Sequence, residues 1–165
     1  MLFFSGCFLW WDRGEYIPPV VKQSPFQYRA ENMQEAKIFV EQRTLNEAQK
    51  LAIISAKKSL LNRIMNKIDS ICLDYDIYYQ DIVSMIKKDI KNAFEKHTTL
   101  VDTVVKQEGY LFVLVSTDFN VIKQTLQIKI QEYLKKYPNK WLKFKQNYDL
   151  QLFNEQINYA FRVRG

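Results

Sequence analysis

The most constraining feature of this sequence is a long stretch without turn-forming residues. The chain has four glycines and four prolines in 165 residues, and none of the eight lies between Phe26 and Glu108. Chains that turn often need glycine, proline, asparagine or aspartate at the turns. The stretch therefore argues against an all-β sandwich, a doubly wound sheet and a glycine-rich phosphate-binding loop, and it predicts a long-helix protein.

Apolar side chains recur along this stretch at spacings of three and four, which is the pattern of one face of a helix. The stripe continues from Ile54 to Val105, with His97 on it and with one slot filled by Lys57. A single helix over about residues 30–108 would be on the order of 115 Å long, so a compact chain could not bury its stripe. We therefore predict a partner helix, either from another chain or from the C-terminal part folding back. The residues of this partner-helix interface are Leu61, Ile64, Ile68, Ile71, Tyr75, Tyr78, Ile82, Ile86, Ile90 and Phe94.

A bundle of shorter helices is the competing interpretation, with turns made by asparagine, aspartate and threonine. The breaks would then fall at Thr44, at Asp74–Asp76 and at His97–Thr99. Because these sites contain neither glycine nor proline, we favour one to three long helices.

The C-terminal third begins at Gly109, which interrupts the stripe and precedes the apolar run Tyr110–Val115. This run is either a buried strand or the start of a helix over about 110–137, and we favour the helix. Pro138 ends or kinks that helix, and a third helix is expected over about 139–160. The predicted fold class is all-α and elongated: one very long amphipathic helix (about 30–108), two shorter helices, and a possible short strand at 110–115. The predicted segments are an N-terminal anchor and proline-rich linker (1–25), a long helical segment (26–108) and a basic C-terminal helical segment (109–165).

The N-terminal residues are apolar and aromatic, but the run is shorter than the about 20 residues that a transmembrane helix needs. Adjacent tryptophans followed by charges are typical of an anchor at a membrane interface. Three alternatives stay open: the segment enters a bilayer, fills a groove on a partner, or packs on the chain's own core. The anchor residues are Phe3, Phe4, Phe8, Leu9, Trp10 and Trp11.

The net charge of +6 is concentrated in the C-terminal third, where seven lysines between Lys123 and Lys145 face only Glu132. Such a run can meet phosphates or anionic lipid headgroups. Interleaved aromatic residues add the possibility of base stacking in a nucleic-acid-binding protein. The alternative, which we favour, is an amphipathic helix whose aromatics pack inward and whose lysines are solvated. The residues of this basic and aromatic face are Lys135, Lys136, Lys140, Trp141, Lys143 and Lys145.

The sequence offers little material for catalysis. It holds one histidine, His97, and two distant cysteines, Cys7 and Cys72, so it shows no nucleophile–base pair and no cluster of zinc ligands. The aspartates at 69, 74, 76 and 81 lack the glycine and the closing glutamate of a calcium loop. We therefore predict no catalytic, cofactor-binding or metal-binding residues, and a protein that is not an enzyme.

Two stretches resemble subunit b of the mitochondrial F-type ATP synthase. The first is Leu45–Ala52, followed by Ala56–Lys57 and Ile68–Asp69; the second is Tyr110–Phe112, followed by Trp141–Phe144. The resemblance covers about residues 26–70 and 105–146. It implies a long peripheral-stalk helix that packs on other stalk subunits and holds the catalytic head against the membrane sector.

The predicted function is therefore a non-catalytic structural subunit of a mitochondrial membrane complex, on the matrix side of the inner membrane. The resemblance implies a stalk-like subunit of the proton-translocating ATP synthase. An accessory subunit of another respiratory complex and an RNA-associated component, such as an organellar ribosomal protein, are the alternatives. Other protein subunits are the expected partners, with a membrane surface at the N-terminus and nucleic acid as the less favoured partner.

Overall fold

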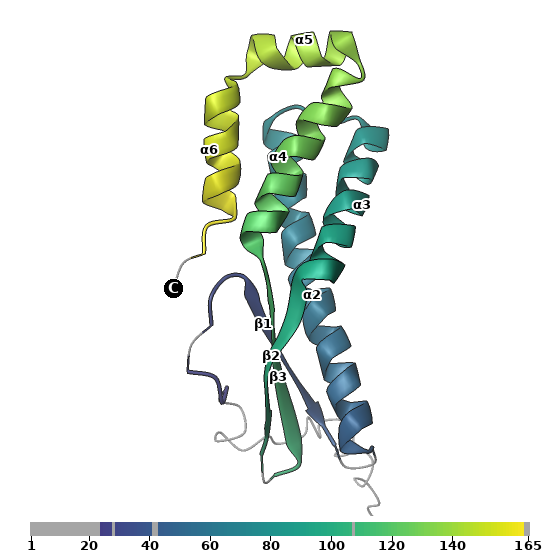
Figure 1. Ribbon diagram of the computed structural model, residues 1–165, viewed down its shortest axis with the longest axis vertical. Coiled ribbons are helices and arrows are strands. Elements are labelled where there is room, and N and C mark those ends of the chain that lie inside the picture. The colour runs from purple at the N-terminus through teal and green to yellow at the C-terminus, as the bar shows by residue number, and fades with distance from the viewer. Residues whose placement is uncertain (1–23, 28, 41–42, 107, 164–165) are drawn as a thin grey trace, which may run out of the picture.

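The fold, seen in a computed structural model, combines a three-stranded antiparallel sheet with helices (Figure 1). The structure describes residues 24–27, 29–40, 43–106 and 108–163. In chain order its elements are β1 (Met33–Phe39), α2 (Leu45–Asp74), α3 (Gln80–His97), β2 (Thr98–Val105), β3 (Tyr110–Thr117), α4 (Phe119–Lys135), α5 (Pro138–Asn147) and α6 (Leu150–Ala160). The predicted all-α fold with one helix over residues 30–108 is therefore wrong, because that range contains two strands and two separate helices.

The helical stretch is divided at the three sites where the competing interpretation placed breaks. Thr44 caps the start of α2, where its hydroxyl accepts the Glu47 N–H and the Glu47 carboxylate accepts the Thr44 N–H. Asp76 turns the chain between α2 and α3 with a φ of 54°, a conformation that aspartate tolerates better than most residues. Thr98 then ends α3, because its hydroxyl donates to the Phe94 carbonyl at 2.6 Å and the chain continues as β2. Side-chain hydrogen bonds and one left-handed residue thus replace glycine and proline at these breaks.

The sheet places β3 between β1 and β2, and both pairings are antiparallel. Val113 lies at its centre, opposite Ala36 on β1 and Thr103 on β2. The run 110–115, for which a strand was the less favoured alternative, forms most of β3. Gly109 makes the turn before it with a φ of 82°, and a Cβ at that position would lie 3.0 Å from the Phe39 ring.

Helix α2 packs against different elements at its two ends. Its buried residues recur every four positions, and a spacing of four advances around a helix of 3.6 residues per turn by about 40° at each step. The buried row therefore winds around α2, facing the sheet near the N-terminus and facing α3 further on. Alanines occupy the first part of the row and larger side chains the second. The row consists of Ala48, Ala52, Ala56, Leu60, Ile64 and Ile68.

One apolar core joins the sheet to the helices. It contains residues from α2, α3, β3, α4, α5 and α6, and Figure 1 shows the sheet in the lower half and the shorter helices above it. The C-terminal region also differs from expectation, because the third helix predicted over 139–160 is two helices. Pro138 occupies the first turn of α5, and the Asp149 carboxylate accepts the N–H groups of Gln151 and Leu152 to start α6. This core draws on both the predicted 26–108 segment and the predicted 109–165 segment.

Replacement of a core isoleucine should separate this fold from a rod with one exposed stripe. Ile86 is fully buried, whereas Ile54, on the same sequence stripe, keeps 62% of its surface exposed. Ile86→Ala should lower the free energy of unfolding by about 2–5 kcal/mol, while Ile54→Ala should change it by less than about 0.5 kcal/mol. Urea denaturation measures both values. Equal effects of the two substitutions would contradict the fold.

Candidate interaction surfaces

The predicted partner-helix interface is largely the chain's own core. Most of its residues are buried, Leu61 and Tyr75 are partly buried, and Tyr78 is 63% exposed. The turn between α2 and α3 folds the stripe back, and α4 brings in buried residues such as Leu126 and Ile130. No helix from another chain is needed to cover this stripe. The buried members are Ile64, Ile68, Ile71, Ile82, Ile86, Ile90 and Phe94.

The predicted N-terminal anchor, residues 3–11, lies outside the described part of the chain. Within the described part, none of the helices has both the length and the apolar character that crossing a membrane requires.

The predicted basic and aromatic face lies at the end of the molecule formed by α5 and the C-terminus of α4 (Figure 1). The ammonium groups of several of its lysines lie over aromatic rings. The Lys140 Nζ is 3.7 Å from the centre of the Tyr79 ring and 4.2 Å from that of Tyr137. Lys135 and Lys145 place their Nζ atoms 5.2 and 5.4 Å from the Trp141 ring centre. A cation over an aromatic face is worth about 0.5–1 kcal/mol at an exposed site.

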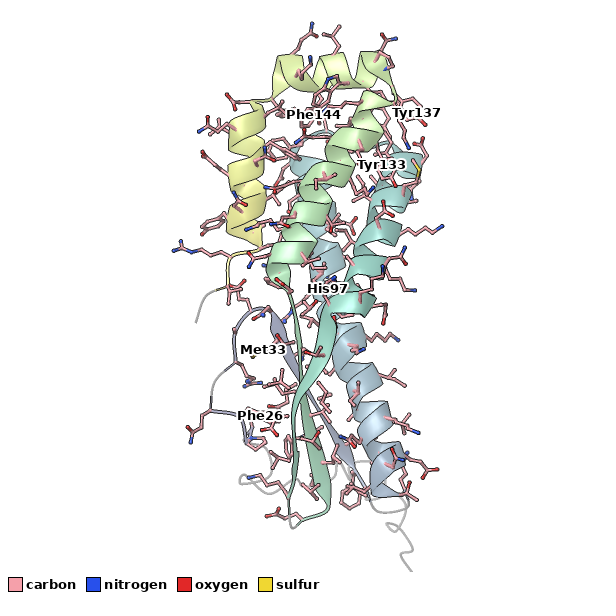
Figure 2. All side chains as sticks on the ribbon, viewed as in Figure 1. Phe26, Met33, His97, Tyr133, Tyr137 and Phe144 are labelled. Atoms are coloured by element: carbon pink, nitrogen blue, oxygen red, sulfur yellow. The ribbon has the colours of Figure 1, made fainter. Side chains whose placement is uncertain are left out.

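The aromatic rings at this end are engaged within the chain, so they are not a free stacking surface. The Trp141 ring stacks on Phe144, with centroids 6.0 Å apart and planes at 9°. The Phe144 ring in turn meets Tyr75 and Phe153 edge-on or tilted. Figure 2 shows Tyr133, Tyr137 and Phe144 gathered where α4 and α5 meet. What remains open to a ligand is the charge of the exposed lysines, among them Lys136 and Lys143.

Three hydrogen bonds between aspartate and tyrosine fasten the C-terminal helices to α3 and to the turn before it. Tyr133 donates to Asp89 at 2.6 Å and Tyr137 to Asp81 at 3.2 Å. A third bond, at 2.5 Å, joins the Tyr148 hydroxyl to Asp76 in the turn. Asp76 accepts this hydrogen bond as a carboxylate, so it raises the pKa of Tyr148 to about 12, while the same bond lowers the pKa of Asp76. These carboxylates also offset part of the lysine charge at this end.

The chemistry available within the described residues is slight. They contain no group of three or more histidine, cysteine or acidic residues that could hold a metal ion. Burial raises the pKa of Cys72 to about 11, so this thiol is protonated at neutral pH and is a weak nucleophile. A hollow beside Tyr75 and Lys140 has a volume of only about 20 Å³, which is room for one water molecule. His97 is exposed where α3 passes into β2 (Figure 2).

An open strand edge is the surface that the sequence reasoning missed. β2 pairs with β3 on one side only among the described residues, and α2 packs over β1 and β3 but hardly reaches β2. Leu100, Val101 and Val105 are therefore 40%, 49% and 53% exposed. The available signal was the run Thr98–Val105, in which six of eight residues are threonine or valine, both of which favour strands.

A groove between α2 and α3 lies on the same side as this edge. Its volume is about 420 Å³, and it is lined by apolar residues of both helices, such as Ile53 and Phe94. Ile53 follows Gln49 by one helical turn, and the Gln49 amide donates to the Thr103 hydroxyl on β2 at 3.1 Å. The Ile53 end of the groove therefore lies near β2. Its charged lining residues are Lys57, Lys58, Lys91 and Glu95.

Comparison with protein-family models and with curated proteins gives no match for this chain. The resemblance to ATP synthase subunit b therefore stays a prediction. The proposed function rests on two surfaces: the exposed lysines at the α5 end, and the side formed by the β2 edge and the α2–α3 groove.

The hydrogen bond between Tyr148 and Asp76 should be visible in the alkaline titration of the protein. Unfolded tyrosine titrates near pH 10, so the unfolded state loses its proton first. The contribution of this bond to stability is thus present below about pH 10 and is lost as the pH rises toward 12. The thermal midpoint of the wild type should exceed that of Tyr148→Phe at neutral pH, and the gap should close across this range.

Asp76→Asn provides the matched control, because asparagine tolerates the same left-handed backbone but carries no charge. Asp76 raises the pKa of both Tyr148 and Tyr78 through side-chain hydrogen bonds, so ultraviolet absorbance should show these two tyrosines titrating at lower pH in Asp76→Asn than in the wild type. If Tyr148 already ionises near pH 10 in the wild type, the proposed hydrogen bond is absent.

Proposed function

We propose that this chain is a non-catalytic subunit of a larger protein assembly, in which it acts as a binding module. The observation that carries the proposal is the side formed by the β2 edge and the α2–α3 groove. There, apolar side chains and unpaired backbone lie exposed together, and edge strands of this kind pair readily with another chain. Within the described residues, neither a group of metal ligands nor the protonated Cys72 thiol supports a proposal of enzymatic activity.

The finer proposal, a stalk-like subunit of the mitochondrial ATP synthase on the matrix side of the inner membrane, rests on the resemblance alone. A hairpin occupies residues 98–117, so a subunit of this shape would act as a compact bracket between neighbouring subunits rather than as a continuous stalk helix. An accessory subunit of another respiratory complex would use the same β2 side with a different neighbour.

The exposed lysines favour a second candidate function, an RNA-associated component of an assembly such as an organellar ribosome. Lys135, Lys136, Lys143 and Lys145 lie close together in sequence and are all exposed. Phosphate contacts of this type weaken steeply as the salt concentration rises. An assembly held by an apolar surface and strand pairing weakens far less.

Extraction of the native assembly should distinguish these proposals. A tagged full-length chain, extracted in mild detergent, should migrate far above its own mass of 19.8 kDa in a native gel. The assembly should survive both ribonuclease and half-molar salt, and the double variant Lys143→Glu/Lys145→Glu should still enter it.

Each alternative gives a distinct result in the same experiment. Loss of the assembly with ribonuclease, together with exclusion of the lysine variant, would favour the RNA-associated function. Co-migration with ATP hydrolysis activity in the gel would support the ATP synthase proposal. Migration of the untreated wild-type chain as a monomer would contradict the proposal of a subunit.

A further inference from the structure

The backbone phase of β2 shows which of its N–H and C=O groups point away from β3. The Lys106 N–H donates to the Tyr110 carbonyl at 2.8 Å, and the register is regular from Asp102 to Val105. Alternate residues of an antiparallel strand direct their N–H and C=O groups to opposite sides. Val104 therefore faces β3, whereas Thr103 and Val105 face outward. The Thr103 N–H, consistent with this phase, donates to the Asp102 carboxylate at 2.7 Å.

The two edges of the sheet differ in how they are protected. β1 carries Glu35 and Lys37, and Glu35 forms an ion pair with Arg29. β2 has no lysine and no proline, and its only charged residue is Asp102. A bulge between Leu100 and Asp102 interrupts its register, so the regular part of the edge runs from Asp102 to Val105. Charges, prolines and bulges are the devices that block strand addition, and the part of β2 from Asp102 to Val105 carries one charge, that of Asp102, and no proline.

We propose that β2 accepts an extended segment of a partner protein as a fourth strand, and that this segment carries acidic and β-branched side chains. The inference rests on the proposed function as a subunit and names the binding mode. The added strand would pair with the outward N–H and C=O groups of Val105 and with the outward C=O of Thr103, because the Thr103 N–H already donates to Asp102. Its inward side chains would cover the apolar surface of Val105 and Leu100 and reach the groove at Ile53.

Charge decides the chemistry of the partner. Lys57, Lys58 and Lys91 line the groove, against the carboxylates of Glu95 in the groove and Asp102 on β2. The lysines outnumber these carboxylates, so a segment whose glutamate or aspartate side chains reach the groove is attracted there and a basic segment is repelled. The same charges oppose a second copy of this chain as the occupant. Antiparallel pairing of β2 with β2 requires a two-fold axis perpendicular to the sheet, which places both sets of lysines on one face.

Binding of synthetic peptides to the full-length chain tests this inference. The probes are fluorescent ten-residue peptides in which valine or threonine alternates with glutamate, a version with lysine in place of glutamate, and a version of the glutamate peptide N-methylated at every second residue. We expect the glutamate peptide to bind, and the lysine and N-methylated peptides to bind at least about tenfold more weakly, as loss of a hydrogen bond and of charge attraction requires. Hydrogen exchange at Val105 should slow when the glutamate peptide is added.

Val105→Pro is the protein variant that tests this pairing, because proline lacks the outward-facing N–H and is tolerated on an edge strand at such a position. It should weaken binding of the glutamate peptide by about tenfold, and by more than Val105→Thr, which keeps the backbone N–H. Lys57→Glu/Lys58→Glu should also weaken binding, while Lys143→Glu/Lys145→Glu, at the far end of the molecule, should not. Circular dichroism confirms that each variant is folded, and the N-methylated peptide tests the same contact without altering the protein.

Several results would overturn the inference. The first is equal binding of the glutamate and N-methylated peptides. The second is slow hydrogen exchange at the Val105 N–H in the monomeric chain without peptide. The third is that the chain forms a dimer and that Val105→Pro dissociates it. A fourth is normal entry of Val105→Pro into the native assembly, which would refute strand addition while the subunit proposal stands. Failure of the wild-type chain to enter any assembly would instead refute the proposed function.

Discussion

The turn between α2 and α3 is the constraint on which the rest of the structure depends. It folds one apolar stripe in half, so that residues on both sides of the turn, such as Ile68 and Ile82, contribute to one core. Asp76 adopts the left-handed conformation there and also accepts the Tyr148 hydroxyl from the end of α5. The same residue thus turns the chain and fastens the C-terminal helices to the turn. Without this reversal, the stripe would need another molecule to cover it.

Folding the stripe inward determines which surfaces are left for partners. Because α2 crosses β1 and β3 and then continues to α3, β2 receives little cover from α2. The outer edge of the sheet and the α2–α3 groove are open for the same reason. At the opposite end, aromatic side chains pack together and several lysines are exposed. The two surfaces therefore suit different ligands, an extended acidic segment at β2 and a weakly held anion at α5.

Periodicity in the sequence predicted which residues are buried better than it predicted what buries them. The spacing of Ile64, Ile82 and Ile90 indicates that one helical face is covered, but it does not distinguish a partner chain from the chain's own helices. The hairpin of β2 and β3 was misassigned because Val104 and Val105 continue the helical spacing, although the threonines and valines before them favour a strand. The lysine end was found from composition, whereas the β2 edge was not, because an edge exists only once the strand order is known.

The central claim is that the stripe is buried within a single chain, and small-angle X-ray scattering of the purified protein tests it most directly. A compact domain of this length has a radius of gyration of about 15 Å, whereas a rod of about 115 Å gives about 33 Å. We predict a monomer whose radius of gyration lies closer to the compact value, at all protein concentrations where no partner is present. A value near that of the rod, or association driven by the Leu61–Phe94 stripe, would contradict the account.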